Sequence, residues 1–177
     1  MRLVLAHGAS GSAASMRPWI DGLRARGIDA GAIDLPVRKA ETAVDAYRIA
    51  AGLGVTEAPA TVIGGHSYGG RVASLLAAAS GPGTDPSIGG LVLLSYPLHR
   101  PGDPSWDART VHWPDIRVPV LLLSGESDPF ARIDLLRMAV AERLTDAELV
   151  TWPRLGHTLK PVLDAVLDRV AAFVSAR

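Results

Sequence analysis

Short apolar segments alternate along this chain with segments whose apolar residues recur at helical spacing. The apolar segments, at 2–6, 28–34, 60–65, 90–96, 118–124 and 147–152, predict strands. The intervening segments predict helices, at 13–26, 39–53, 69–80, 131–143 and 160–175, with Pro161 in the first turn of the last one. Residues 97–117 show no clear period, so we predict a loop there with at most one helical turn.

Strand and helix alternate throughout, and several strands are continuous apolar runs. Such runs are typical of a parallel sheet that is covered on both faces. We therefore predict an α/β fold, with a mostly parallel sheet of about six strands and helices on both faces. Neither a linker nor an internal repeat interrupts the 177 residues, so a single domain over 1–177 is expected. Active sites of such sheets lie at the carboxyl ends of the strands.

The third predicted strand ends in a candidate nucleophile. Residues 65–69 have the G-x-S-x-G pattern centred on Ser67, between an apolar strand and an Ala/Leu-rich helix. A sharp strand-to-helix turn brings the chain before and after the serine very close together, and Gly65 and Gly69 have no Cβ that would clash. The sequence therefore predicts a nucleophile elbow.

A serine hydroxyl needs a base that takes its proton, and His157 is the candidate. It follows the last predicted strand and precedes the last helix. The other four histidines compete less well: His66 lies inside the elbow and is expected to point away from Ser67, His7 belongs to the first loop, and His99 and His112 fall in the irregular segment.

The expected acid, which orients the histidine, is Asp128. It comes shortly after the strand at 118–124. The three residues therefore follow one another along the chain as Ser, Asp, His, which is the order expected when the nucleophile lies on such an elbow. Glu126 is the nearest rival and Asp103 a weaker one. An aspartate before a proline is also common in ordinary turns.

An oxyanion hole requires two N–H donors. One is expected from Tyr68, directly after the nucleophile. The second is expected from the glycine-rich first loop, from Ala9 with Ser10 as the rival. This loop lacks the lysine of a phosphate-binding P-loop and the G-x-G-x-x-G spacing, which argues against nucleotide binding.

Composition narrows the classes of function. The chain has 18 basic and 18 acidic residues, so it lacks the basic footprint of a nucleic-acid binder or an anionic-membrane binder. It has no cysteine, which excludes disulfides and a cysteine nucleophile. No metal-ligand spacing is visible, and the expected chemistry needs no cofactor. Without a visible signal peptide or a long apolar stretch, we expect a cytoplasmic protein that does not bind a membrane.

The four tryptophans are expected to lie in the core or in the wall of a pocket. Of these, Trp106 and Trp113 lie in the irregular segment and are candidates to line an acyl pocket.

With these motifs the chain resembles the α/β-hydrolase superfamily over nearly its whole length. The segment 93–99 (LLSYPLH), together with GASG near the start, is similar to the KANSL3/Tex30-like α/β-hydrolase group. The resemblance implies a minimal hydrolase without a cap, beginning at the third strand of the full fold, with Ser67, Asp128 and His157 as its triad. An edge strand left open in this way could pair in a dimer, so a monomer or a homodimer is expected.

Two functions follow from this interpretation. The first is a serine hydrolase that cleaves a small ester or thioester through an acyl-enzyme, with a small-molecule acyl substrate and an open, shallow site. The second is a catalytically silent interaction protein that keeps the fold.

Overall fold

The computed structural model describes residues 1–54, 60–80 and 87–177. The strands form one sheet in the order β2-β1-β3-β4-β5-β6, and every neighbouring pair is parallel. This confirms the predicted parallel sheet. The strands are β1 Arg2–Ala6, β2 Asp29–Ile33, β3 Thr61–His66, β4 Ile88–Leu94, β5 Val120–Gly125 and β6 Ala147–Trp152.

The α-helices are α1 Arg17–Arg24, α2 Val44–Ala50, α3 Tyr68–Ala79, α4 Asp107–Thr110, α5 Ile133–Arg143 and α6 Leu163–Ser175. Short 3₁₀ helices precede three of them: η1 Ala13–Met16, η2 Ala40–Ala43 and η4 Lys160–Val162. The predictions of continuous helices over 13–26, 39–53 and 160–175 were therefore too simple. Proline explains the first of the three breaks, because Pro18 has no N–H to donate back into the preceding turn.

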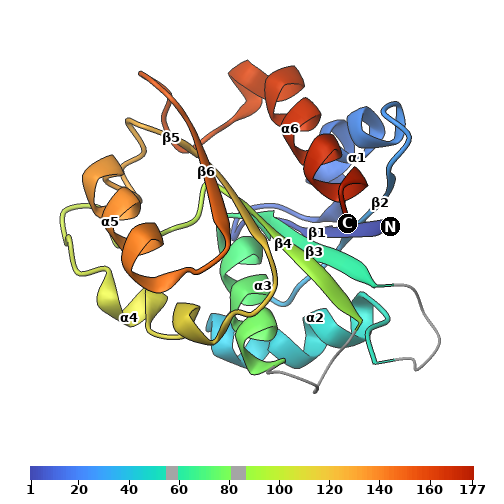
Figure 1. Ribbon diagram of the computed structural model, residues 1–177, viewed down its shortest axis with the longest axis horizontal. Helices are drawn as coiled ribbons and strands as arrows, with labels where there is room; N and C mark the ends of the chain where they lie inside the picture. The colour runs from blue at the N-terminus through green and yellow to red at the C-terminus, as the bar shows by residue number, and fades with distance from the viewer. Residues whose placement is uncertain (55–59, 81–86) are drawn as a thin grey trace.

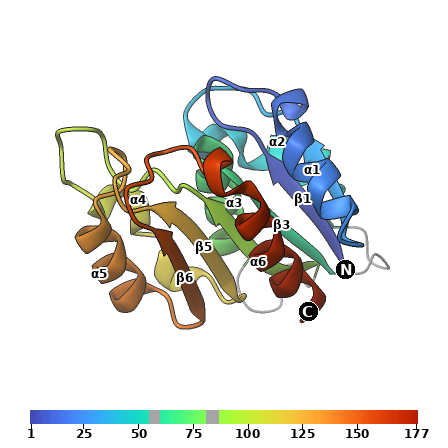
Figure 2. The same ribbon diagram turned by 90° about the horizontal axis from the view of Figure 1, so that it is seen from above.

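Helices cover both faces of the sheet (Figures 1 and 2). One face is covered by α1 and α6, and the opposite face by α2, α3 and α5. Alternate residues of a strand point to opposite faces, so the central strands must be apolar throughout. In β1, Leu3 and Leu5 pack beneath α1 and α6, whereas Val4 and Ala6 pack beneath α2 and α3.

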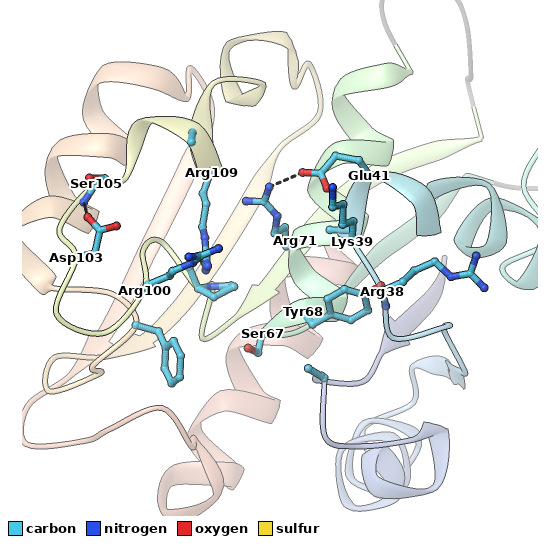
Figure 3. A pocket seen from close by; sticks show the side chains of 15 residues that line it. Arg38, Lys39, Glu41, Ser67, Tyr68, Arg71, Arg100, Asp103, Ser105 and Arg109 are labelled. Carbon is cyan, nitrogen blue, oxygen red and sulfur yellow. Dashed lines mark hydrogen bonds and ion pairs between the residues drawn. The ribbon is translucent and has the colours of Figure 1, made fainter.

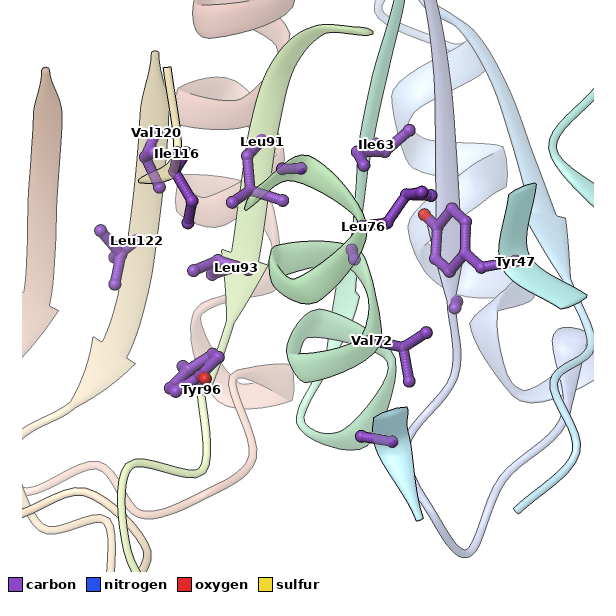
Figure 4. Packing of buried hydrophobic residues seen from close by; sticks show 14 of the residues in the cluster. Tyr47, Ile63, Val72, Leu76, Leu91, Leu93, Tyr96, Ile116, Val120 and Leu122 are labelled. Carbon is purple, nitrogen blue, oxygen red and sulfur yellow. The ribbon is translucent and has the colours of Figure 1, made fainter. Parts of the chain in front are cut away.

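The core under α2, α3 and α5 also contains polar atoms (Figure 4). The side chain of Tyr47, from α2, is fully buried among Ile63, Val72 and Leu76. Its hydroxyl oxygen lies 2.8 Å from the carbonyl oxygen of Val4 and 2.7 Å from that of Gly64, and it accepts the N–H of Gly64 at 2.9 Å. Tyr47 thus connects α2 to the backbones of β1 and β3.

The segment between β4 and β5 is short and contains α4 and the 3₁₀ helix η3 Trp113–Asp115, where at most one helical turn was predicted. It adds no helical cap to the fold. Among the described residues, no helix is long and apolar enough to cross a membrane.

Candidate active site

Ser67 lies at the sharp turn between β3 and α3. Its backbone angles are φ 50° and ψ −111°. This region of the backbone map is energetically unfavourable for any residue that has a Cβ atom. The turn is held from both sides, because the N–H of Ser67 donates to the carbonyl of Leu94 (2.8 Å) and the N–H of Arg71 donates to the carbonyl of Ser67 (3.0 Å).

The two glycines of the G-x-S-x-G pattern occupy positions where a side chain does not fit. A Cβ on Gly65 would lie 2.5 Å from the carbonyl oxygen of Ala6, and one on Gly69 would lie equally close to the same atom. The N–H of Gly69 also donates to the carbonyl of His7 at 3.1 Å. The elbow is therefore packed directly against the end of β1.

The structure brings Ser67, His157 and Asp128 into one hydrogen-bonded chain. His157 Nε2 lies 2.9 Å from Ser67 Oγ, and His157 Nδ1 lies 2.7 Å from Asp128 Oδ2. The carboxylate of Asp128 is fully buried, and its Oδ1 accepts the N–H of Phe130 at 2.8 Å. The ring of Phe130 packs against that of His157, with centroids 4.6 Å apart.

Neither rival acid contacts His157. Glu126 Oε1 accepts hydrogen bonds from Arg137 and from Thr151, both at 2.8 Å. Asp103 is exposed, and hydrogen bonds from the side chain and then the backbone N–H of Ser105 lower the pKa of Asp103.

The other histidines have structural partners. His7 Nε2 accepts the N–H of Leu35 at 3.1 Å, so Nδ1 carries the proton and donates to the carbonyl of Gly8 at 2.8 Å. By the same logic His99 Nε2 accepts the N–H of Arg132 and its Nδ1 donates to a carbonyl. His7 thereby fixes the first loop, and His99 fixes the chain that follows Asp128.

His66 and His112 lie away from Ser67 Oγ. His66 Nε2 lies 3.3 Å from the carbonyl oxygen of His157, and burial lowers the pKa of His66. His112 Nε2 lies 2.8 Å from Ser74 Oγ. Burial, followed by the positive charge of Arg71, lowers the pKa of His112 to about 4.

The two expected oxyanion donors flank one cleft. Ser67, Tyr68 and Ala9 line a cleft of about 680 Å³, whereas Ser10 lines a separate, smaller hollow. Tyr68 is the first residue of α3, where a helix has no acceptor for the N–H. The turn bond of the first loop runs from Gly11 N to Gly8 O and does not use the N–H of Ala9.

The suggestion that Trp106 and Trp113 line an acyl pocket was wrong, because neither residue lines this cleft. Trp113 is fully buried in the core and lies edge-on to Tyr96, and Trp106 stacks with the guanidinium group of Arg143. Polar side chains line much of the cleft instead, as Figure 3 shows.

Sequence reasoning missed Gly125, the last residue of β5. A Cβ there would lie 2.2 Å from the carbonyl oxygen of Leu155 and 2.4 Å from that of Gly156. The N–H of Ser127 donates to the same Leu155 carbonyl at 2.8 Å. This close approach holds the loop of His157 against the loop of Asp128. A glycine ending a buried strand was the available signal.

Fold and site geometry together define a class. A parallel sheet with helices on both faces, and a strained serine turn at the carboxyl end of a central strand, are features of α/β-hydrolases. The family model described as "Alpha/beta hydrolase domain" matches residues 35–175, so the chain belongs to the α/β-hydrolase family. Comparison with curated protein sequences finds no significant match.

Solved structures share this fold at low sequence identity. Est1E from Butyrivibrio proteoclasticus with ferulic acid bound is 17% identical, with a TM-score of 0.79 over 99% of this chain and 89% of that one. A monoacylglycerol lipase from Paleococcus ferrophilus is 16% identical, with a TM-score of 0.74 over 96% and 93%. A thioesterase domain from the curacin biosynthetic pathway is 16% identical, with a TM-score of 0.72 over 98% and 90%. At these identities the likeness shows the fold alone.

Proposed function

We propose that this protein is a serine hydrolase that cleaves a small ester or thioester through an acyl-enzyme on Ser67. The observation that carries the proposal is the continuous chain of hydrogen bonds from Ser67 Oγ through His157 to the buried carboxylate of Asp128. This arrangement meets the requirement that a nucleophile and its base lie in contact and that a third group orients the base.

In the first half of the reaction, Ser67 Oγ attacks the carbonyl carbon while His157 Nε2 takes the hydroxyl proton. The negative charge that develops on the carbonyl oxygen accepts hydrogen bonds from the N–H groups of Tyr68 and Ala9. The tetrahedral intermediate then expels the alcohol or thiol, which receives the proton from His157. Ser67 is left acylated.

In the second half, water attacks the acyl carbon. His157 takes a proton from the water and returns it to Ser67 Oγ, which leaves as the carboxylic acid product is released. Asp128 accepts the Nδ1–H of His157 throughout and stabilises the imidazolium that forms twice in each cycle. This sequence of steps needs no metal and no cofactor.

The same proposal covers the finer features of the protein. The resemblance of the 93–99 segment to the KANSL3/Tex30-like group is consistent with a minimal hydrolase over 1–177 in which Ser67 faces an open cleft. A small acyl compound is the proposed substrate. The protein is proposed to be a monomer or a homodimer, and a homodimer would form at β2 or β6, the two edge strands of the sheet.

The test is labelling of the purified protein with a fluorophosphonate probe, which reacts with activated serines. We expect labelling of the wild type and none of Ser67→Ala, and strongly reduced labelling of His157→Ala. Ser127→Ala is the matched control, because it removes an exposed hydroxyl next to Asp128 that has no part in the proposed mechanism. It should label like the wild type.

Short-chain p-nitrophenyl esters and acyl thioesters then separate the two substrate classes by kcat/KM. A folded wild type that neither labels nor hydrolyses any of them would overturn the proposal in favour of an interaction protein with the hydrolase fold.

A further inference from the structure

Basic side chains are concentrated in the cleft beside Ser67, although charges balance over the whole chain. Five of them line it: Arg38, Lys39, Arg71, Arg100 and Arg109. Two acidic residues, Glu41 and Asp103, also line it. The cleft therefore has an excess of positive charge directly beside the nucleophile (Figure 3).

Arg71 and Arg109 are the two partly buried members of this set, and they reach the cleft from α3 and α4 (Figure 3). Arg71 Nη2 donates to Glu41 at 2.6 Å, but its Nη1 is buried and has no hydrogen-bond partner among the described residues. Arg109 Nη1 donates to the carbonyl of Pro97 at 2.7 Å. Within the described part of the chain, no carboxylate forms an ion pair with Arg109.

Arg109 lies in an environment that disfavours its positive charge. Burial and then the positive charge of Arg71 lower the pKa of Arg109, and Arg100 lowers it further, whereas Tyr96 and Asp103 raise it in part. Placing like charges together in a partly buried cleft is unfavourable unless a negative group joins them. Guanidinium groups bind carboxylates and phosphates through paired N–H donors.

We propose that the cleft recognises a carboxylate or phosphate group of the substrate through Arg71 and Arg109. This inference rests on the proposed function of Ser67 and adds a substrate class to it, namely an anionic ester or thioester. Arg71 follows Ser67 by four residues, about one helical turn. Ser67, Arg71 and Arg109 line the same cleft, so the anionic group belongs to the substrate that Ser67 attacks, on the acyl part or on the leaving group.

Matched pairs of esters test the preference. Monophenyl glutarate is compared with phenyl valerate, which places the charge on the acyl part. A second pair, 4-(butyryloxy)benzoate and its methyl ester, places the charge on the leaving group. In at least one pair we expect kcat/KM to be about tenfold or more higher for the anionic ester, after subtraction of spontaneous hydrolysis.

Variants assign the preference to residues. Arg71→Gln and Arg109→Gln should each reduce the anionic-to-neutral ratio of kcat/KM by about tenfold, and Arg109→Lys should retain part of it. Arg169→Gln is the matched control, because Arg169 lies on α6 and pairs with Glu148 at the surface. It should keep the wild-type ratio.

A binding measurement tests the site without catalysis. In Ser67→Ala, glutarate or inorganic phosphate should raise the thermal midpoint above that in sodium chloride of equal ionic strength, and the rise should be lost when Arg71→Gln or Arg109→Gln is added. The ligand that gives the larger rise distinguishes carboxylate from phosphate.

The two proposals can fail separately. Fluorophosphonate labelling of Ser67 without any charge preference or anion-induced stabilisation would overturn the anion site and leave the hydrolase proposal standing. Stabilisation by anions that depends on Arg71 and Arg109, in a protein that does not label, would keep the anion site and overturn the hydrolase.

Discussion

The two halves of the site are attached to different parts of the sheet. Ser67 and the loop that contains Ala9 extend from β3 and β1, which have strands on both sides, whereas Asp128 and His157 follow β5 and the edge strand β6. Within each half, backbone contacts fix the geometry. The halves meet at His157, whose Nε2 faces Ser67 and whose carbonyl oxygen lies 3.3 Å from His66 Nε2.

This difference separates two ways of losing activity. The serine half is built into the centre of the sheet, so a change there should affect the stability of the whole protein. The acid–base half depends on the pairing of two loops at an edge, so a change there should displace His157 and reduce catalysis in addition to any loss of stability.

The largest effect is expected for Asp128→Asn, which keeps the size of the side chain and removes the charge that orients His157. We expect kcat to fall by about 10⁴-fold, in line with the loss of this role in serine hydrolases. Glu126→Gln, two residues earlier, should change kcat less than about twofold, because Glu126 contacts Arg137 and Thr151 instead. Equal losses in the two variants, measured with the best ester substrate, would refute the assignment of the acid.

Gly125→Ala should break the pairing of the two loops. Its Cβ would overlap the carbonyls of Leu155 and Gly156, so the loop of His157 must move. We expect a loss of about 10²-fold in kcat/KM and of about 1–3 kcal/mol in the free energy of unfolding. Gly31→Ala in β2 is the control, because a Cβ there meets nothing within 4 Å. If Gly125→Ala retains full activity in ester assays, this close approach does not position His157.

Tyr47→Phe tests the serine half. Burial raises the pKa of Tyr47, so its hydroxyl stays protonated and bridges the backbones of Val4 and Gly64. Removing it leaves buried backbone groups without a partner, which should cost about 1–3 kcal/mol in urea unfolding. Tyr68→Phe removes a partly exposed hydroxyl that donates to Pro36 and should cost less. A larger cost for Tyr68→Phe would contradict the bridging role of Tyr47.

The smallest effect concerns the pH dependence of stability through His112, which lies beside Ser74 of α3. Its pKa is about 4 in the folded protein, against 6.5 for a free histidine, chiefly through burial and then Arg71. Between these values the unfolded chain binds more protons, so this contribution is complete above pH 6.5 and is lost as the pH falls toward 4. Because His112 is partly exposed, we expect about 1 kcal/mol.

Urea unfolding of the wild type and His112→Gln at pH 7.5 and pH 4.5 measures this term. The drop in the free energy of unfolding should be smaller in the variant. His66, whose pKa is also lowered, contributes in the same direction in both proteins and cancels in the difference. An identical drop in the two proteins would show that His112 does not titrate as described.

The parts of the protein that sequence reasoning recovered are those that depend on neighbours along the chain. Apolar runs and helical spacing predicted the six strands and most helices, because burial on one or both faces imposes a period on the sequence. The elbow was recognisable for the same reason: Gly65, Ser67 and Gly69 must be adjacent to form one turn. Position just after strands of a parallel sheet also singled out the candidates Asp128, with Glu126 as its rival, and His157.

Other features depend on segments far apart in the chain. Glu126 and Asp128 could not be separated by sequence spacing, because only the folded loops show which carboxylate contacts His157. The need for Gly125 arises from a loop about thirty residues later. The basic cleft is similarly invisible in a balanced composition, since Arg71 of α3 and Arg109 of α4 come together only in the folded structure. Local periodicity encodes elements, whereas close approach and charge in three dimensions arise from their packing.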